Sequence, residues 1–287
     1  VITFRNGRGG GDVVAIDAAT GHYAHTRSAN NSDEVIAISS NDRVGTVSSD
    51  RVALWRSDLV RTVEYGDVEA KQEPDLQPHE ECTINSALTR TELLVVSESC
   101  PGNTQVDHLR FQTTTPEDSR EPELTQEVTI DGDGARLVAV GQSAAAVYVP
   151  GERPAIISYN DEGQETSRTD VAPSAKIRDS ASPFAAATAD LPHHMTWFDG
   201  ERLYLFTPTA LRVTQVIEQA IGTGVSAGDK ALVPTREGID VIDWTTGDVQ
   251  RSIPVDRKGY AGEVYLAIAD GNIVEARDGE LVALTSS

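Results

Sequence analysis

The segments GDVVAIDAATG at residues 11–21 and GIDVIDWTTG at residues 238–247 spell nearly the same pattern at opposite ends of the chain. In each, an apolar run ends at Ile-Asp, two residues follow, and Thr-Gly precedes a new run. Glycine supplies the positive φ of a tight bend, and an aspartate side chain accepts hydrogen bonds from turn amides. We therefore predict the same hairpin corner twice. Its residues are Asp17, Thr20 and Gly21 in one copy and Asp243, Thr246 and Gly247 in the other.

Strand-like runs recur along the chain at the short spacing typical of all-β proteins, separated by Gly, Asp, Asn or Ser turns. They form sets of four, and three further runs lie at each end of the chain. The sets span residues 34–66, 82–130, 135–171, 183–217 and 221–255. The best helical candidate, residues 211–222, also alternates and is assigned to a strand. Four antiparallel strands repeated about every 40–50 residues indicate the blades of a β-propeller.

The whole chain, residues 1–287, is predicted to be one all-β domain, a β-propeller of four-stranded antiparallel blades. Seven blades with incomplete ends is the favoured number and six is the alternative. The corner described above would link the third and fourth strands of a blade, and residues 54–60 and 158–163 look like eroded copies. Because a propeller closes by pairing strands from the two chain ends, which removes open sheet edges, we expect such pairing here.

The two corner segments, VVAIDAATGHYAHT and DVIDWTTGDVQRSI, resemble the repeat of PQQ-like, or quinoprotein-alcohol-dehydrogenase-like, β-propellers. That repeat reads approximately Ala-x-Asp-x-x-Thr-Gly-x-x-x-Trp. The resemblance implies kinship in shape with non-enzymatic members of the BamB type. Where the family places its tryptophan, this chain has Ala24 or His25 in one copy and Ser252 or Ile253 in the other. The docking of tryptophan on glycine between blades is therefore expected to be weakened.

The same resemblance implies no quinone chemistry for this chain. PQQ enzymes of the family have a larger, eight-bladed propeller, a catalytic Asp, a Ca²⁺ bound by Glu and Asn, and usually two adjacent cysteines. This chain is too short for that barrel, has no Cys-Cys pair, and has no acidic residue that matches the catalytic Asp. No catalytic residue, cofactor or metal ligand is therefore predicted.

Other motifs with chemical potential are weak. His193 and His194 are neighbours, and neighbours on a strand point to opposite faces, so they cannot chelate one ion. The acidic stretches 131–134 and 160–163 fall where hairpin turns are expected and match no calcium loop. The glycine-rich residues 7–12 lack the lysine of a phosphate-binding loop, and nucleophile signatures are absent.

Cys82 and Cys100 are the only cysteines of the chain. If residues 89–93 form a hairpin bend, these two positions are equidistant from it and face each other across the strands. A disulfide here would stabilise the fold by about 3 kcal/mol in the chain-entropy model. Two unrelated buried thiols are the alternative, whereas the spacing fits no zinc site. Because disulfides persist in oxidising compartments, we predict an extracytoplasmic location.

The formal net charge is −21. This charge repels phosphate backbones and anionic lipids, so neither nucleic acid nor a lipid surface is expected as a partner. No apolar run approaches the ~20 residues needed to cross a bilayer, so this segment should not insert into a membrane. The chain starts at Val1 without a secretory segment, and we expect a targeting or anchoring segment to have been removed or cut away.

Three Pro- and acid-rich segments, residues 72–81, 115–124 and 171–183, are expected to leave one face of the propeller as long loops. Loops on a rigid scaffold usually carry binding, and this composition suits a protein partner. We therefore predict a non-catalytic, extracytoplasmic interaction platform in a bacterial cell envelope, secreted or anchored, whose partners are envelope proteins. The alternative is a diverged quinoprotein, a hydrolase with paired carboxylates or a small-ligand binder that uses the mouth of the central channel.

Overall fold

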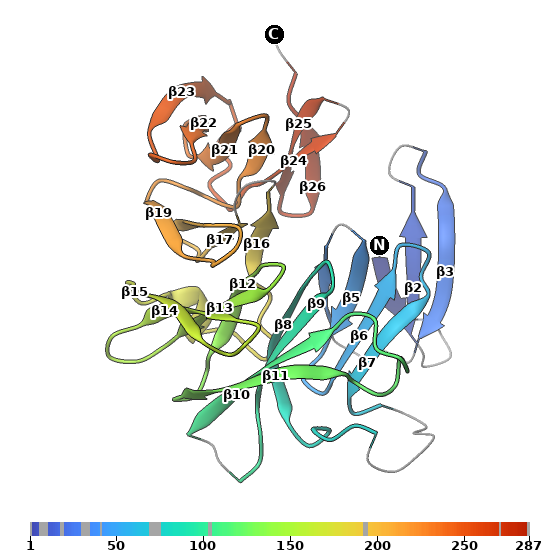
Figure 1. Ribbon diagram of the computed structural model, residues 1–287. Coiled ribbons are helices and arrows are strands. Elements are labelled where there is room, and N and C mark those ends of the chain that lie inside the picture. Colours follow the sequence, from blue (N-terminus) through green and yellow to red (C-terminus); the bar gives the residue numbers. More distant parts are fainter. Residues whose placement is uncertain are drawn as a thin grey trace.

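The computed structural model describes residues 2–5, 11–17, 20–29, 35–40, 42–68, 76–102, 105–191, 195–269 and 271–285. Over these residues the chain forms seven antiparallel sheets, five with four strands and one with three strands at each end (Figure 1). Within each sheet the strands are neighbours in sequence order, so every sheet is a simple meander. No helix of the described chain is long and apolar enough to cross a membrane.

The strand bounds are as follows. The first sheet holds β1 (Ile2–Arg5), β2 (Gly11–Ile16) and β3 (Tyr23–Ala29), and the second holds β4 (Ile36–Ser39), β5 (Arg43–Val47), β6 (Arg51–Arg56) and β7 (Arg61–Gly66). The third holds β8 (Thr83–Arg90), β9 (Leu93–Ser99), β10 (Val106–Thr113) and β11 (Leu124–Asp131), and the fourth holds β12 (Arg136–Val140), β13 (Ala144–Val149), β14 (Ala155–Asn160) and β15 (Glu165–Asp170). The fifth holds β16 (Ala187–Asp190), β17 (Met195–Phe198), β18 (Leu203–Phe206) and β19 (Val213–Ile217), and the sixth holds β20 (Val225–Ala227), β21 (Lys230–Thr235), β22 (Gly238–Asp243) and β23 (Val249–Pro254). The seventh holds β24 (Tyr265–Ala269), β25 (Asn272–Arg277) and β26 (Glu280–Ala283), and one short helix, α1 (Ala175–Arg178), follows β15.

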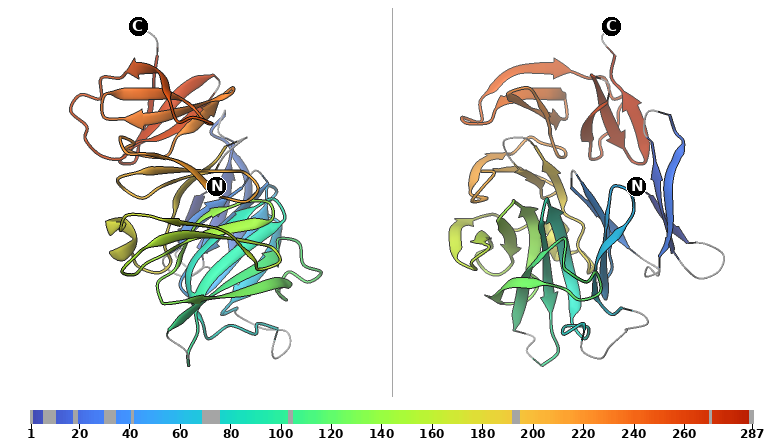
Figure 2. Two further views of the ribbon diagram at one scale, coloured as in Figure 1. Left: turned by 60° about the vertical axis from the view of Figure 1, so that its left-hand side comes forward. Right: turned by 45° about the vertical axis from the view of Figure 1, so that its right-hand side comes forward.

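These sheets coincide with the sets of runs predicted from the sequence, and the prediction of seven blades with incomplete ends is confirmed. The sheets are arranged around a common axis (Figure 2). The first strands of successive sheets contact one another, as β8 does with β4 and with β12. These first strands therefore lie nearest the axis, and the fourth strands form the periphery.

The core lies between the sheets. One apolar cluster joins the second, third and fourth sheets, and smaller clusters join the first to the second, the fourth to the fifth, the fifth to the sixth and the sixth to the seventh. Strands in the middle of a sheet, such as β13, are buried on both faces because a neighbouring sheet packs on each side. The fourth strands, such as β19, alternate between exposed and half-buried residues.

The expected pairing of the two chain ends is not observed in the described residues. β1 pairs only with β2, and β26 pairs only with β25. Each end instead folds its three strands into a local meander, because hairpins between sequence neighbours close short loops at low entropic cost. The arc of sheets nevertheless brings the red seventh sheet round toward the blue first sheet (Figure 2).

Because neighbouring strands run in opposite directions, each connection lies at one of the two ends of the sheets. Turns between second and third strands and links from one sheet to the next share one end, which we call the connection face. Residues 76–81 and 171–183 lie on this face, as expected, and the first part of the predicted loop 72–81, residues 72–75, lies outside the described residues. Residues 115–124 do not, because they join β10 to β11 and so begin at the other end of the third sheet. Gln77 still bridges the two segments, since its Nε2 donates to the carbonyl oxygens of Glu64, at 2.9 Å, and Arg120, at 2.6 Å.

Candidate binding site on the connection face

The two repeated corners adopt the same geometry. Thr20 donates to Asp17 Oδ1 from its amide, at 2.8 Å, and from its hydroxyl, at 2.9 Å, and Gly21 has φ +70°. In the second copy the amides of Thr245 and Thr246 donate to Asp243 Oδ1, and Gly247 has φ +76°. The bonds from the Thr245 amide and from Lys230 lower the pKa of Asp243. These residues lie at the end opposite the connection face, where they form turns.

The same corner recurs with other residues in other sheets. Gly163, with φ +78°, donates its amide to the carbonyl of Asn160 in the expected eroded copy. Leu59, in the other expected copy at residues 54–60, and Leu211 also occupy the positive-φ position, with φ +59° and +50°. Both leucine side chains are fully buried, so packing between sheets compensates for a backbone conformation that favours glycine. The corner at Leu211 was not predicted, because its segment lacks both the Asp and the Gly.

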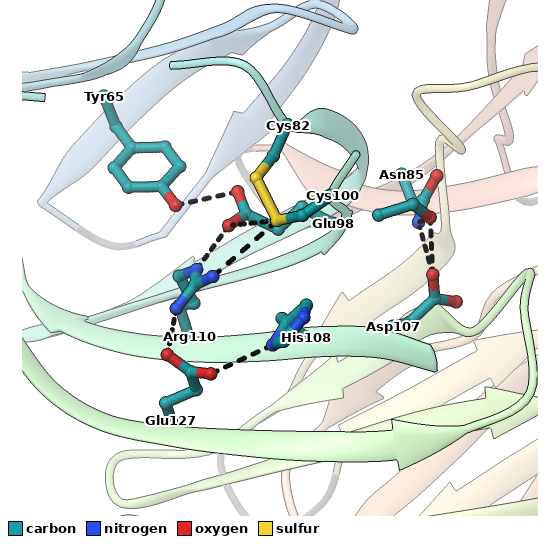
Figure 3. Close-up of a disulfide and its surroundings, with 10 residues drawn as sticks. Tyr65, Cys82, Asn85, Glu98, Cys100, Asp107, His108, Arg110 and Glu127 are labelled. Atoms are coloured by element: carbon teal, nitrogen blue, oxygen red, sulfur yellow. Dashed lines mark hydrogen bonds and ion pairs between the residues drawn. A yellow bond between two sulfur atoms is a disulfide. The ribbon is translucent and has the colours of Figure 1, made fainter. Parts of the chain in front are cut away.

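The disulfide between Cys82 and Cys100 is present, as predicted (Figure 3). The predicted register is right at the cysteines but wrong by one residue near the bend, where Arg90 pairs with Leu93 across a two-residue turn. A β-bulge between Ile84 and Ser86 corrects the difference, because its extra residue, Asn85, restores the alignment of the two cysteines. Cys82 precedes β8 and Cys100 follows β9, which places the bridge on the connection face.

A buried polar network adjoins the disulfide and ties the second sheet to the third (Figure 3). Tyr65 of β7 donates its hydroxyl to Glu98 of β9 at 2.7 Å, and Arg110 of β10 forms ion pairs with both Glu98 and Glu127. Burial raises the pKa of Glu98, although Arg110 and Tyr65 oppose the shift. Burial and the adjacent Glu98 carboxylate also raise the pKa of Tyr65, so its phenol remains protonated at neutral pH.

The same network contains a geometrical candidate for a metal site. Ligand atoms of His79, Cys82 and Glu98 lie within 4.8 Å of one another. The Cys82 sulfur is bonded to Cys100, and both oxygens of Glu98 accept hydrogen bonds from Arg110 or Tyr65. A thiolate and a free carboxylate are both missing, so these residues do not fit a metal ion. The cluster is an internal brace between two sheets.

A cleft of about 920 Å³ opens on the connection face. Its walls are the turns that follow β17 and β21, the links after β19 and β23, and the edges of β22 and β23. No residue of a first strand lines it, so the cleft lies between blades, away from the axis. Apolar residues of its lining include Phe198, Ile221 and Pro254.

Five carboxylates and one arginine line this cleft. They are Glu201, Glu218, Glu237, Asp240, Glu263 and Arg236. Glu218 and Glu237 are exposed and form no ion pair with a described residue. Asp240 accepts a hydrogen bond from Ser252 at 2.6 Å. The cleft therefore carries uncompensated negative charge above a partly apolar floor.

Helix α1 contacts two residues that line the cleft. Its Lys176 lies 2.9 Å from Glu263 and 5.8 Å from the centre of the Phe198 ring. Burial disfavours ionisation of Glu263, but hydrogen bonds from Tyr265 and Lys176 outweigh it and lower the pKa of this carboxyl. The contact links the connection before the fifth sheet to the connection before the seventh.

Sequence reasoning did not predict the cleft, because its residues come from the fifth and sixth sheets and from the connections that follow them. The turns at 200–201 and 236–238 are equivalent turns of two consecutive sets, and each contains an acidic residue. This repeat was the signal in the sequence that pointed to an acidic site. His193 and His194 lie outside the described residues. The acidic stretch 131–134 forms the link from β11 to β12, not the hairpin turn that was expected.

No protein-family model matches the chain, and no curated protein matches it in sequence. A chain in the crystal structure of a mitotic checkpoint complex superposes with a TM-score of 0.53 at 9% identity, over 95% of this chain and 82% of that chain. The dihydro-heme d1 dehydrogenase NirN in complex with DHE superposes with a TM-score of 0.55 at 9% identity, over 96% of this chain and 61% of NirN. This chain thus spans less than two thirds of the length of NirN.

At such low identity these likenesses show the fold alone. Together with seven sheets around one axis, they define the class: the chain is a β-propeller.

Proposed function

We propose that this protein is a non-catalytic propeller of the PQQ-like, BamB-type kind that binds a basic segment of an envelope protein outside the cytoplasm. The observation that carries the proposal is the acidic cleft on the connection face. A cleft with one sign of charge concentrates ligands of the opposite sign and speeds their association. The apolar floor suits the aliphatic stems of lysine and arginine side chains, which pack on apolar surface while their charged ends stay at the rim.

Two observations support the remaining parts of the proposal. The Cys82–Cys100 bridge is of a kind that persists in oxidising compartments, which favours an extracytoplasmic location. Buried titratable groups such as Glu98 and Arg110 form ion pairs with each other where two sheets pack together. This arrangement favours a structural role over catalysis.

Binding in the cleft can be tested with a defined probe, an eight-residue peptide of alternating lysine and alanine. Its affinity is measured by isothermal titration calorimetry for the wild type and for the double variant Glu218→Lys, Glu237→Lys. The matched control is Glu162→Lys, Glu280→Lys, which makes the same change in net charge at exposed positions elsewhere.

We expect the cleft variant to bind roughly tenfold or more weakly and the control to stay within about threefold of the wild type. Equal loss in both variants would mean that only the net charge attracts the peptide, and the cleft proposal would then be abandoned. Thiol titration of the protein from its native host tests the location, since two free thiols would contradict it.

The competing enzyme hypothesis predicts a cofactor. Incubation with PQQ and Ca²⁺, followed by melting and by visible absorbance, separates the two functions. A bound chromophore together with a rise of several degrees in Tm would overturn the non-catalytic proposal, because a tight ligand stabilises the native state by mass action.

A further inference from the structure

A second, smaller pocket lies on the connection face on the other side of α1. Its volume is about 370 Å³, and it opens between the fourth sheet and the segment that contains the helix. Tyr148, Ile177 and three prolines (Pro150, Pro154 and Pro173) make most of its wall apolar. Its two charged residues are Arg136 and Arg178, and no carboxylate lines it. In a chain with a net charge of −21, a cavity with only positive charge calls for an explanation.

Arg136, the first residue of β12, is 9% exposed and forms no ion pair with a described residue. Its Nη1 donates to the carbonyl of the preceding residue at 3.2 Å, and its Nη2 donates to Ser182 Oγ at 3.4 Å. Its Nε is buried and has no hydrogen-bond partner. Burial lowers the pKa of Arg136, and the carboxylates of Asp107 and Asp133 offset only part of this shift.

Asp107, the buried carboxylate of these two, already has hydrogen-bond partners. Asp107 accepts hydrogen bonds from the Ala135 amide at 2.7 Å and from Ser99 and Asn85. It is therefore held by uncharged donors and is not the partner of the guanidinium.

Three other buried arginines of the chain form ion pairs with a carboxylate. Arg110 pairs with Glu98, Arg202 with Asp199 and Arg257 with Glu275. A buried charge without a partner costs several kcal/mol, which is why buried ions in proteins are usually paired. Such an arginine is expected where a ligand supplies the missing charge.

We propose that this pocket binds a ligand through a carboxylate, which pairs with Arg136 while the apolar body of the ligand packs on Tyr148, Ile177 and the prolines. Arginine presents a planar fork that matches the two oxygens of a carboxylate. One buried guanidinium balances the single charge of a carboxylate, whereas a phosphate dianion would leave excess negative charge in an already acidic protein. The volume admits a body of roughly two or three residues, at the lower end of ligand pockets.

The carboxylate could belong to the C-terminus of a protein chain or to a free organic acid, and both share the same recognition. Three probes separate these sources: acetyl-Ala-Leu with a free carboxylate, the same dipeptide as its amide, and succinate. Each is titrated into the full chain by calorimetry at neutral pH, with inorganic phosphate as a fourth probe. Variants are Arg136→Gln, Arg136→Lys and the control Arg251→Gln, an exposed arginine of β23.

We expect the free acid to bind and the amide to bind at least about tenfold more weakly, because only the acid supplies a charged partner for the guanidinium. Arg136→Gln should abolish the difference between acid and amide, Arg136→Lys should reduce it, and Arg251→Gln should leave it unchanged. Binding of the dipeptide without succinate assigns a chain terminus, and binding of succinate alone assigns a free acid. Equal binding of acid and amide, no binding of either carboxylate probe, or tighter binding of phosphate through Arg136 would overturn the proposal.

A second readout does not depend on choosing the right probe. If Arg136 serves a ligand, Arg136→Gln should leave the Tm of the ligand-free protein unchanged or raise it, because the variant removes an unpaired buried charge. Arg110→Gln, which breaks an ion pair inside the fold, should lower the Tm clearly. A similar drop in both variants would assign Arg136 a structural role and contradict the proposal.

Discussion

Single residues decide the corner geometry in two different ways. At Gly21 and Gly247 the residue type itself favours the positive φ of the turn. At Leu59 and Leu211 the side chain is buried between sheets, and its apolar contacts hold the same backbone conformation. The same turn conformation is thus set by local backbone preference at the glycines and by tertiary packing at the leucines.

The disulfide is the residue-scale feature with the clearest energetic consequence. Replacing both Cys82 and Cys100 by alanine should lower the free energy of unfolding by about 3 kcal/mol, because the bridge closes a loop with a sequence separation of 18. Guanidinium unfolding with and without reductant measures this effect. The double variant should not respond to reductant, and a wild type that also fails to respond would show that the bridge contributes nothing.

Two backbone segments lie very close together at the junction between the sixth and seventh sheets. A Cβ at Gly222 would lie 1.8 Å from the carbonyl oxygen of Val264. The amide of Val264 also donates a hydrogen bond to the carbonyl oxygen of Ile221, at 2.9 Å. We expect Gly222→Ala to lower the Tm by several degrees or more, because backbone on both sides must move. In the control Gly141→Ala the nearest atom, the Pro208 oxygen, lies at 3.2 Å, so a much smaller change is expected. Equal melting of the two variants would contradict this account.

The same junction carries a buried ionic triad. Arg257 donates to Glu275 and to the carbonyl oxygens of Thr235 and Gly238, and Arg277 pairs with the second oxygen of Glu275. Burial disfavours ionisation of Glu275, but its bonds from the two arginines outweigh burial and lower its pKa. The triad joins β25 to the turn between β21 and β22.

This shift sets the direction of a pH effect. Because the pKa of Glu275 is lower in the folded state, its contribution is present above its ordinary value of 4.5 and is lost as the pH falls below it. Urea unfolding should therefore show a steeper loss of stability below about pH 4.5 in the wild type than in Glu275→Gln. The control Glu165→Gln, in an exposed pair with Arg168, should follow the wild type. Parallel curves for wild type and Glu275→Gln would contradict the prediction.

At the scale of the whole molecule, stability should be uneven around the arc. No described apolar cluster or strand pair joins the seventh sheet to the first, whereas the largest cluster joins the second, third and fourth. We expect amides of β1–β3 and β24–β26 to exchange with solvent faster than those of β8–β14, because elements with fewer buried contacts open at lower free energy. Hydrogen exchange followed by mass spectrometry measures this difference. Equal protection in all sheets would contradict the prediction, because it would show that the first and seventh sheets are as stable as the others.

Much of this architecture was predictable from local pattern. Alternating runs and Gly or Asp turns specify meanders, since each strand pairs with its neighbour in the chain, and the five internal sets match five sheets. The facing of Cys82 and Cys100 also follows from the hairpin. The bulge at Asn85 does not, because its polar side chain bonds to Ser99 and Asp107 across two further strands.

The sequence by itself determined the class of fold, the order of the blades and the disulfide, because each depends on residues that are close in the chain. Only the tertiary structure decided that the two chain ends form separate three-stranded sheets, which leucines adopt the corner conformation, and where the acidic cleft and the Arg136 pocket lie. Both cavities are formed by connections of different sheets, and these come together only when the sheets pack around the axis. The net charge of −21 likewise gives no sign of the small positive pocket, because a sum over the sequence does not show which charged residues the fold places together.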